Sequence, residues 1–153
     1  MIQLDIPGRG VIELHHAVFD LNGTLAIDGM FIPGVPDRLL RLSELLEIHI
    51  LTAGTHGNIA RLEKASGQPF RLIGHGEEKR HYVEQLDPRT VIAFGNGTND
   101  AGMLRAAAIG VAILGAEGLS MEALRTADIL VRSPIDAIDL ILRSKRLLAT
   151  LRE

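Results

Sequence analysis

A carboxylate at the end of an apolar run is the side chain of this sequence best placed for covalent chemistry. The run 16–20 ends in Asp20, and the backbone is then turned away by Asn22, Gly23 and Thr24. The carboxyl ends of strands are where α/β sheets bind ligands, and a carboxylate held there can attack phosphorus as a covalent nucleophile. Asp, Asn and Gly after a strand also form ordinary turns. Asp20 is therefore either a nucleophile or part of a turn.

Two further polar residues, Thr52 and Lys79, lie at the ends of predicted elements. Thr52 ends a second apolar strand and is followed by Ala53 and Gly54, so a hydroxyl and free amides at a helix start can hold a phosphate group. The same residues can also act as a simple helix cap. Lys79 stands near the start of the next predicted helix, where a cation opposes the helix dipole. That position indicates either a charge that binds an anion or a lysine exposed to solvent.

A loop rich in glycine follows the strongly apolar segment 90–94. It contains Gly95, Asn96, Asn99 and Asp100. Glycine lets a backbone approach a ligand closely, and Asn and Asp side chains supply oxygen ligands. The loop indicates a binding site, with an ordinary loop capped by Asn99 or Asp100 as the alternative.

The elements that would position these residues alternate between strand and helix patterns. Strands are predicted at 2–6, 11–14, 16–20, 48–52, 70–73, 90–94, 109–113 and 128–131, and helices from Pro36, over 56–66, 77–86, 100–107 and 119–126, and from Ile135. The first two strands read as a hairpin ahead of the sheet. Regular alternation implies parallel strands with helices on both faces. The fold class expected is a doubly wound, three-layer α/β/α domain over residues 1–153, with a central parallel sheet preceded by an N-terminal β-hairpin.

Composition excludes several classes of function. The chain has 153 residues, a net charge of −3, 3% aromatic residues and no cysteine. It therefore has no disulfide framework or thiolate metal site. It also lacks the net positive charge and the aromatic residues expected of a protein that binds nucleic acid. No apolar run is long enough to span a membrane, and no signal peptide is visible, so a cytoplasmic protein without membrane or nucleic-acid partners is expected. Its six histidines show no tight spacing for metal ligands.

Taken in order, the polar positions resemble the motifs of the haloacid dehalogenase-like superfamily of aspartyl-phosphate phosphohydrolases. The resemblance covers residues 16–132. Within the superfamily, the segment GNGTNDAGML at 95–104 is similar to the GDGxNDxxxL motif of P-type ATPases, and as in those ATPases the residue two after Asp20 is not Asp. The resemblance implies the fold described above and a site that binds Mg²⁺.

The resemblance also implies a role for each candidate residue. Asp20 would be the nucleophile that becomes phosphorylated, and the metal would be bound by Asp20, the Asn22 main-chain carbonyl and Asn96, with support from Asn99 and Asp100. This set matches the preference of Mg²⁺ for a few protein oxygens plus water. The catalytic group would be Asp20, Asn22, Thr52 and Lys79. The residues that would bind phosphate are Leu21, Gly23, Thr24, Thr52, Ala53, Gly54 and Lys79.

Two residues depart from the phosphatase pattern. Asn22 stands where phosphatases of the superfamily carry an Asp that protonates the leaving group and then activates water. Asn can do neither, and loss of a general acid/base costs about 10²–10⁴ in rate. Asn96 stands where a metal-binding Asp is usual, so Mg²⁺ binding is expected to be weak. These substitutions predict a slow phosphatase with a long-lived aspartyl phosphate, or a phosphoryl carrier.

The short segments between Asp20, Thr52 and Lys79 leave no room for an inserted cap domain. The open site suits either a large phosphorylated substrate or a homo-oligomer in which a neighbouring subunit covers it. A non-catalytic module that binds phosphate or Mg²⁺ and regulates a partner or an assembly is the alternative function. A receiver-like signalling domain also places Asp, Thr and Lys at strand ends, but the residues after Asp20 and the 95–100 loop argue against it.

Overall fold

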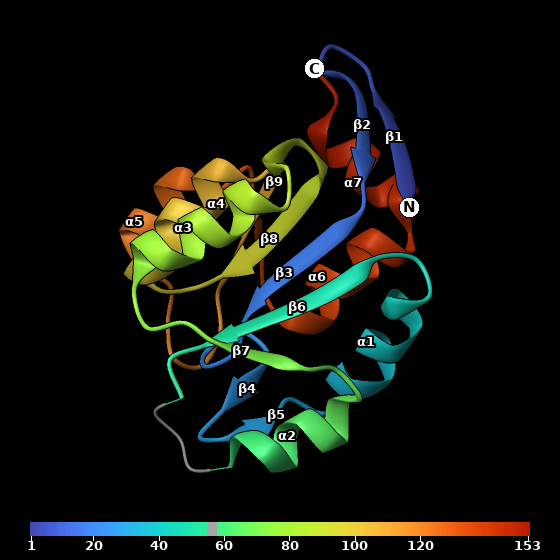
Figure 1. The fold of residues 1–153 in the computed structure, drawn as a ribbon. Helices are drawn as coiled ribbons and strands as arrows, with labels where there is room; N and C mark the ends of the chain where they lie inside the picture. Colours follow the sequence, from blue (N-terminus) through green and yellow to red (C-terminus); the bar gives the residue numbers. More distant parts are fainter. Residues whose placement is uncertain (55–57) are drawn as a thin grey trace.

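The computed structural model of the protein describes residues 1–54 and 58–153. Its centre is a sheet of six strands in which all neighbours pair in parallel (Figure 1). In order across the sheet the strands are β10 (Ile129–Val131), β9 (Ile109–Ile113), β8 (Val91–Gly95), β3 (His16–Asp20), β6 (Glu47–Thr52) and β7 (Phe70–Leu72). From β3 the chain first builds one half of the sheet and then crosses to the other side. Asp20 thus lies at the point where strand order reverses, which is where open α/β sheets bind ligands.

Helices cover both faces of the sheet, as predicted (Figure 1). One face carries α3 (Gly76–Gln85), α4 (Ala101–Ala106) and α5 (Met121–Thr126). The opposite layer contains α1 (Val35–Ser43), α6 (Pro134–Leu142) and α7 (Ser144–Leu151), with α2 (Ile59–Ser66) beside α1. The 3₁₀ turns η1 (Pro88–Thr90) and η2 (Thr98–Asp100) precede β8 and α4. The fold is therefore the three-layer α/β/α arrangement expected from the sequence.

Some helix boundaries differ from the predicted ones. The predicted helix 56–66 starts at positions outside the described residues, and the helix in the described part begins at Ile59. The helix predicted at 119–126 begins at Met121, because the Ser120 side chain accepts the Ala123 amide as an N-cap. The C-terminal helical stretch is two helices separated at Arg143, whose backbone (φ −123°, ψ 66°) is not helical.

The core is divided by the sheet into two layers. In β3, Ala17 and Phe19 face the layer under α1 and α6, whereas Val18 faces the layer under α3 and α4. Phe19 stacks on Phe94 of β8 with ring centroids 4.5 Å apart. Both faces of β3 are covered, which explains why its central residues 17–19 are all apolar. The same cover leaves Asp20, at the end of the strand, buried.

The predicted N-terminal hairpin is present as a separate two-stranded sheet of β1 (Ile2–Ile6) and β2 (Gly10–Leu14). It packs beside α7, and the chain end returns to it, because the Glu153 amide donates to the Pro7 carbonyl at 2.9 Å. Figure 1 shows the two chain ends on this side of the molecule. The hairpin therefore extends the fold at the edge opposite the carboxyl ends of the sheet.

A second hairpin, which the sequence analysis did not predict, follows the turn after Asp20. Its strands β4 (Ala26–Ile27) and β5 (Met30–Phe31) are joined by Asp28 and Gly29, with φ of 49° and 76°. Two positive φ values match the type I′ turn that Asp-Gly favours in two-residue hairpins. This short hairpin is the only strand pair between β3 and α1 in the part of the chain that the structure describes.

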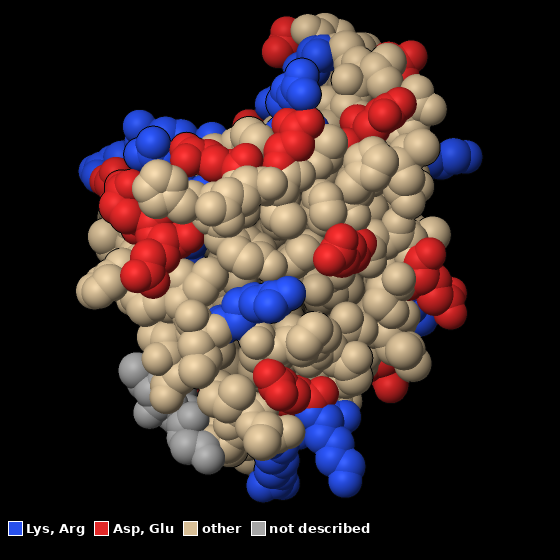
Figure 2. Space-filling view, in the orientation of Figure 1, with Lys and Arg blue, Asp and Glu red and all other residues tan. Residues whose placement is uncertain are grey.

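Charged side chains of both signs are interspersed on the face seen in Figure 2, and they gather over α3 and its neighbours. On α3, Arg80 pairs with Glu77 at 3.6 Å and with Glu84 at 2.8 Å. These pairs neutralise the basic charge locally. Among the described residues, no helix is long and apolar enough to cross a membrane.

Candidate active site

Asp20 is a buried carboxylate held by two donors at the carboxyl end of β3. It is 7% exposed. Its Oδ2 accepts a hydrogen bond from Thr24 Oγ1 at 3.1 Å, and its Oδ1 accepts from Lys79 Nζ at 2.7 Å. The tight turn at 21–24 brings the Thr24 hydroxyl back onto the carboxylate. Asp20 is therefore oriented by groups on both sides rather than exposed in a turn.

Lys79 joins Asp20 to a second buried carboxylate. Its Nζ lies 2.8 Å from Asp100 Oδ1, and the two residues are 1% and 0% exposed. The other oxygen of Asp100 accepts the amides of Asn96 at 3.0 Å and Gly97 at 2.9 Å. Asp100 thus fixes both the lysine and the glycine-rich loop. The alternative of a solvent-exposed lysine at this position is wrong.

The electrostatics of this group are asymmetric, because one ammonium faces two carboxylates. Burial, with Asp100 as the next contributor, raises the pKa of the Asp20 carboxyl to about 7 against the lowering effect of Lys79. Burial alone would lower the pKa of Lys79, but Asp20 and Asp100 together raise it. Lys79 therefore remains a cation, and the negative charge of Asp20 is only partly compensated by the side chains around it.

Asn96 is placed next to Asp20 through Thr24. The Thr24 hydroxyl lies 3.3 Å from Asn96 Oδ1 as well as 3.1 Å from Asp20 Oδ2, while Asn96 Nδ2 donates to the Gly118 carbonyl at 3.1 Å. With Nδ2 held in this way, the amide oxygen faces the Thr24 hydroxyl. At Gly23 φ is +81°, and a Cβ there would lie 2.5 Å from Asn96 Nδ2. Only glycine fits between the turn and this side chain.

Thr52 and Asn22 meet at the end of β6. Thr52 is 1% exposed, and its Oγ1 accepts the Gly54 amide at 3.2 Å and lies 3.5 Å from Asn22 Nδ2. The hydroxyl therefore accepts a hydrogen bond within the turn after β6 and also lies beside the residue two after Asp20. The alternative of a helix cap is wrong, because the N-cap position of α2 is Asn58. Ala53 and Gly54 are exposed.

Four of the residues expected to contact phosphate or to support the metal are arranged differently in this structure. The Gly23 amide donates to the Ala26 carbonyl at 2.8 Å, and the Thr24 amide donates to the carbonyl of Leu21 at 3.3 Å, so both amides are occupied within the turn. Leu21 itself is buried. Asn99 is exposed, and its Oδ1 would lie 2.8 Å from a Cβ at Gly97. Asp100 turns inward, whereas Asn99 stays outside the charged group.

The loop after β9 also contributes to the site, although its residues were not among those predicted from the sequence. Besides the contact of Gly118 with Asn96 Nδ2, the Ser120 amide donates to the Asn96 carbonyl at 2.8 Å, and a Cβ at Gly115 would lie 3.4 Å from the Gly23 carbonyl. The signal was present, because Gly115 and Gly118 follow a buried strand in the same way as Gly95. This loop positions Asn96 from the side opposite Thr24.

The candidate active site does not coincide with the cavity at the amino edge of the sheet. A cavity of about 780 Å³ opens between β2, η1 and the end of α4, at the amino edge of the sheet. The buried, mutually paired Asp20, Lys79 and Asp100 lie at the carboxyl edge. Buried titratable groups with perturbed pKa values cluster at functional sites, and the carboxyl ends of the strands are where α/β sheets bind ligands, so the candidate active site is the carboxyl edge.

Comparison with known proteins finds a family model for haloacid dehalogenase-like hydrolases that matches residues 74–127. An uncharacterized protein of Methanocaldococcus jannaschii is 40% identical over 65 residues, which are 42% of this chain and 70% of that protein. The ATP-binding subunit of a potassium-transporting ATPase from Halobacterium salinarum is 27% identical over 162 residues. That match covers 95% of this chain and 22% of the ATPase subunit.

Solved structures with the same fold include several phosphatases. A structure ascribed to a 3-deoxy-D-manno-octulosonate 8-phosphate phosphatase of Vibrio cholerae has a TM-score of 0.71 at 17% identity and covers 95% of this chain and 97% of its own. The Moraxella catarrhalis enzyme of that name, in complex with magnesium, phosphate and KDO, has 0.67 at 16% identity, with 91% and 94% covered. A phospho-aspartyl intermediate analogue of phosphoserine phosphatase has 0.66 at 13% identity, with 86% and 99% covered.

Proposed function

The chain belongs to the haloacid dehalogenase-like hydrolase superfamily, and on that premise we propose that it is a Mg²⁺-dependent phosphohydrolase that carries the phosphoryl group on Asp20. The observation that carries the proposal is a chain of hydrogen bonds between side chains at the carboxyl edge of the sheet. It runs from Thr24 through Asp20 and Lys79 to Asp100. A nucleophile must be held in one orientation and a cation must stand beside it to receive the phosphoryl oxygens. This chain of hydrogen bonds supplies both.

In the proposed reaction a carboxylate oxygen of Asp20 forms a bond to phosphorus as the bond to the leaving oxygen breaks. Lys79, which contacts Asp20 at 2.7 Å, is placed to stabilise the negative charge on the transferred group. The Thr52 hydroxyl, at the end of the adjacent strand β6, would donate to the same group. Water then attacks the phosphorus and releases inorganic phosphate and the free Asp20 carboxylate.

The chain's residues fit a magnesium ion beside Asp20. The Asp20 carboxylate and Asn96 Oδ1 both face the Thr24 hydroxyl, and with the Asn22 carbonyl they make a set of hard oxygen ligands that suits Mg²⁺. When bound, the ion would neutralise charge on the phosphoryl group. Asp100 serves this arrangement by fixing the loop that carries Asn96.

Asn22 makes the proposed enzyme slow. Its amide cannot protonate the leaving oxygen or take a proton from water, and in the structure its Nδ2 lies 3.5 Å from the Thr52 hydroxyl. The leaving oxygen must therefore depart as an anion or take a proton from solvent. Substrates with acidic leaving groups, such as aryl phosphates, are expected to react fastest, and hydrolysis of the phosphorylated Asp20 is expected to limit turnover.

We propose a large phosphorylated molecule as the natural substrate. Between β3 and α1 the described chain adds only the short β4–β5 hairpin, so the carboxyl edge of the sheet is approached without a covering domain in this part of the chain. A neighbouring subunit of a homo-oligomer could provide that cover instead. A small metabolite would then be enclosed only in the oligomer.

A regulatory module is the second candidate function. The specific observation in its favour is Asn22, because a site without an acid/base group can hold phosphate or Mg²⁺ without turning over. In that case the charged group around Lys79 would act as an anion-binding switch. The two functions differ in turnover rather than in binding.

Steady-state hydrolysis of an aryl phosphate tests the proposal. With Mg²⁺ present, the wild-type protein is expected to release the aryl alcohol, and removal of the metal with a chelator is expected to stop it. Asp20→Asn is nearly isosteric and is expected to abolish the reaction, whereas the matched control Asp5→Asn, on the exposed outer face of β1, is expected to retain it. Phosphate binding without hydrolysis in the wild-type protein would favour the regulatory module. Undiminished hydrolysis by Asp20→Asn would reject Asp20 as the nucleophile.

A further inference from the structure

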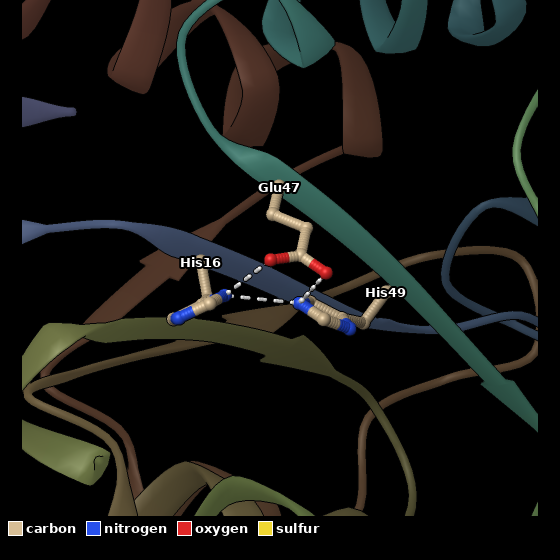
Figure 3. Close-up of side chains that lie close together, drawn as sticks. All are labelled: His16, Glu47 and His49. Carbon is tan, nitrogen blue, oxygen red and sulfur yellow. Dashed lines mark hydrogen bonds and ion pairs between the residues drawn. The ribbon is translucent and has the colours of Figure 1, made fainter. Parts of the chain in front are cut away.

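Two histidines and a glutamate meet toward the amino edge of the sheet, on strands β3 and β6 and outside the group around Asp20. His16 begins β3, and Glu47 and His49 lie near the start of β6. Figure 3 shows the three side chains pointing toward one another between the two strands. The parallel register pairs His16 with Glu47 and Val18 with His49, so all three side chains lie on the α3 face. Spacing along the sequence gave no sign of a histidine metal site, but the register brings these ligands together.

The distances among the three side chains are those of ligands around one small cation. His16 Nδ1 and His49 Nε2 are 3.1 Å apart, and the Glu47 carboxylate lies 3.4 Å from the first nitrogen and 3.8 Å from the second. Two nitrogens each bound to Zn²⁺ at 2.0–2.1 Å are about 3.1 Å apart when they subtend roughly 100° at the metal. One ligand atom from each residue lies within 4.8 Å of the others. The three side chains therefore need no large movement to coordinate one ion.

Tyr82 orients the more buried of the two imidazoles. Its hydroxyl oxygen lies 2.8 Å from His49 Nδ1, and His49 is 5% exposed. Metal-binding histidines usually donate their other ring N–H to a fixed acceptor, which holds the ring and leaves the second nitrogen free to bind. In that tautomer the Tyr82 oxygen accepts from Nδ1, and His49 Nε2 presents a lone pair toward His16 and Glu47.

We propose that His16, Glu47 and His49 form a binding site for a divalent transition metal of the Zn²⁺ type. Two imidazoles and one carboxylate form a set that Zn²⁺ accepts, with the fourth position left to water or another ligand, whereas Mg²⁺ prefers oxygen ligands alone. The Glu47 side chain is 67% exposed, so solvent gives an ion a way in. A bound ion would tie β3 to β6 at the amino edge, while the proposed Mg²⁺ site lies at the opposite, carboxyl edge.

Calorimetric titration of the full chain with Zn²⁺ tests the site. Excess Mg²⁺ in all samples and an Asp20→Asn background keep Zn²⁺ away from the carboxyl edge. One Zn²⁺ per chain is expected to bind and to raise the thermal unfolding temperature. Glu47→Gln keeps the shape of an exposed side chain and is not expected to affect folding, and both it and His16→Gln are expected to weaken Zn²⁺ binding at least about tenfold.

Two controls separate the site from adventitious binding. His15→Gln changes the exposed neighbour of His16, which is outside the cluster, and is expected to leave the affinity unchanged. Tyr82→Phe removes only the acceptor for His49 and is expected to weaken binding about tenfold. Equal Zn²⁺ affinity in the Asp20→Asn parent and in its Glu47→Gln and His16→Gln derivatives would overturn the proposal, and so would imidazole ¹⁵N resonances of His16 and His49 that do not respond to Zn²⁺. These outcomes are independent of whether the protein hydrolyses phosphate.

Discussion

Replacement of Lys79 by Met is predicted to destabilise the protein strongly, because it removes the cation between two buried carboxylates. Lys79 Nζ lies 2.7 Å from Asp20 Oδ1 and 2.8 Å from Asp100 Oδ1, and neither Lys79 nor Asp100 is exposed by more than 1%. Removing one partner of a buried pair leaves an uncompensated charge and costs about 3–5 kcal/mol. For a chain of this size each kcal/mol lowers the unfolding temperature by roughly 2–4 °C. A fall of about 6–20 °C is therefore expected.

Thermal unfolding followed by circular dichroism near neutral pH measures this effect. The matched control is Lys145→Met, because Lys145 is exposed in the first turn of α7, where a cation is not favoured by the helix dipole. The double variant Lys79→Met, Asp100→Asn is expected to unfold at a higher temperature than Lys79→Met alone, since only one buried carboxylate remains. If Lys79→Met unfolds at the same temperature as Lys145→Met, the ammonium does not hold the two carboxylates and the reasoning fails.

Three further predictions concern the residues around this charged group. Asn96→Asp is expected to raise Mg²⁺ affinity at least tenfold in calorimetry, because a unit-charge pair at ~4 Å contributes about 4 kcal/mol before desolvation; equal affinities would mean that Asn96 does not face the metal. Asn22→Asp is expected to raise steady-state turnover of an aryl phosphate by up to about 10²-fold, and an unchanged rate would show that Asn22 does not limit the reaction. Gly95→Ala would place a Cβ 2.5 Å from the Asp100 side chain and is expected to cost about 1–3 kcal/mol in denaturant unfolding, unlike the control Gly74→Ala, which has open space around it.

The strand ends could be predicted because they depend on residues that are adjacent in the sequence. The strands that end at Asp20 and Thr52 are buried on both faces, so each appears in the sequence as an apolar run followed by polar residues. Parallel pairing then brings all such ends to one edge of the sheet. No further information is needed to bring Asp20, Thr52 and the loop beginning at Gly95 close together.

The burial of Lys79 depends on packing between elements distant in the sequence. Its side chain reaches Asp20 and Asp100 only because α3 packs against α4 and η2. The position within the helix could indicate a functional charge but could not distinguish it from a solvated one. The inward turn of Asp100 and the exposure of its neighbour Asn99 likewise depend on the conformation of η2, which composition does not determine.

Three other features could not be predicted from the sequence, each for a different reason. The β4–β5 hairpin carried an Asp28-Gly29 signal, but strands of two residues are too short to show alternation. The break at Arg143 between α6 and α7 has no Gly or Pro to mark it. The meeting of His16 with Glu47 and His49 is set by the register between β3 and β6, a property of the sheet that spacing within one strand cannot reveal.

The central claim is that Asp20 carries the phosphoryl group, and trapping that intermediate tests it most directly. The wild-type protein is mixed with an aryl phosphate and Mg²⁺, quenched in acid during turnover, and examined by intact and peptide mass spectrometry. We predict one phosphoryl group per chain on the peptide that contains Asp20, removed by hydroxylamine as an acyl phosphate and absent from Asp20→Asn. Continued hydrolysis with no phosphorylated protein, or with the phosphoryl group on another residue, would contradict the account.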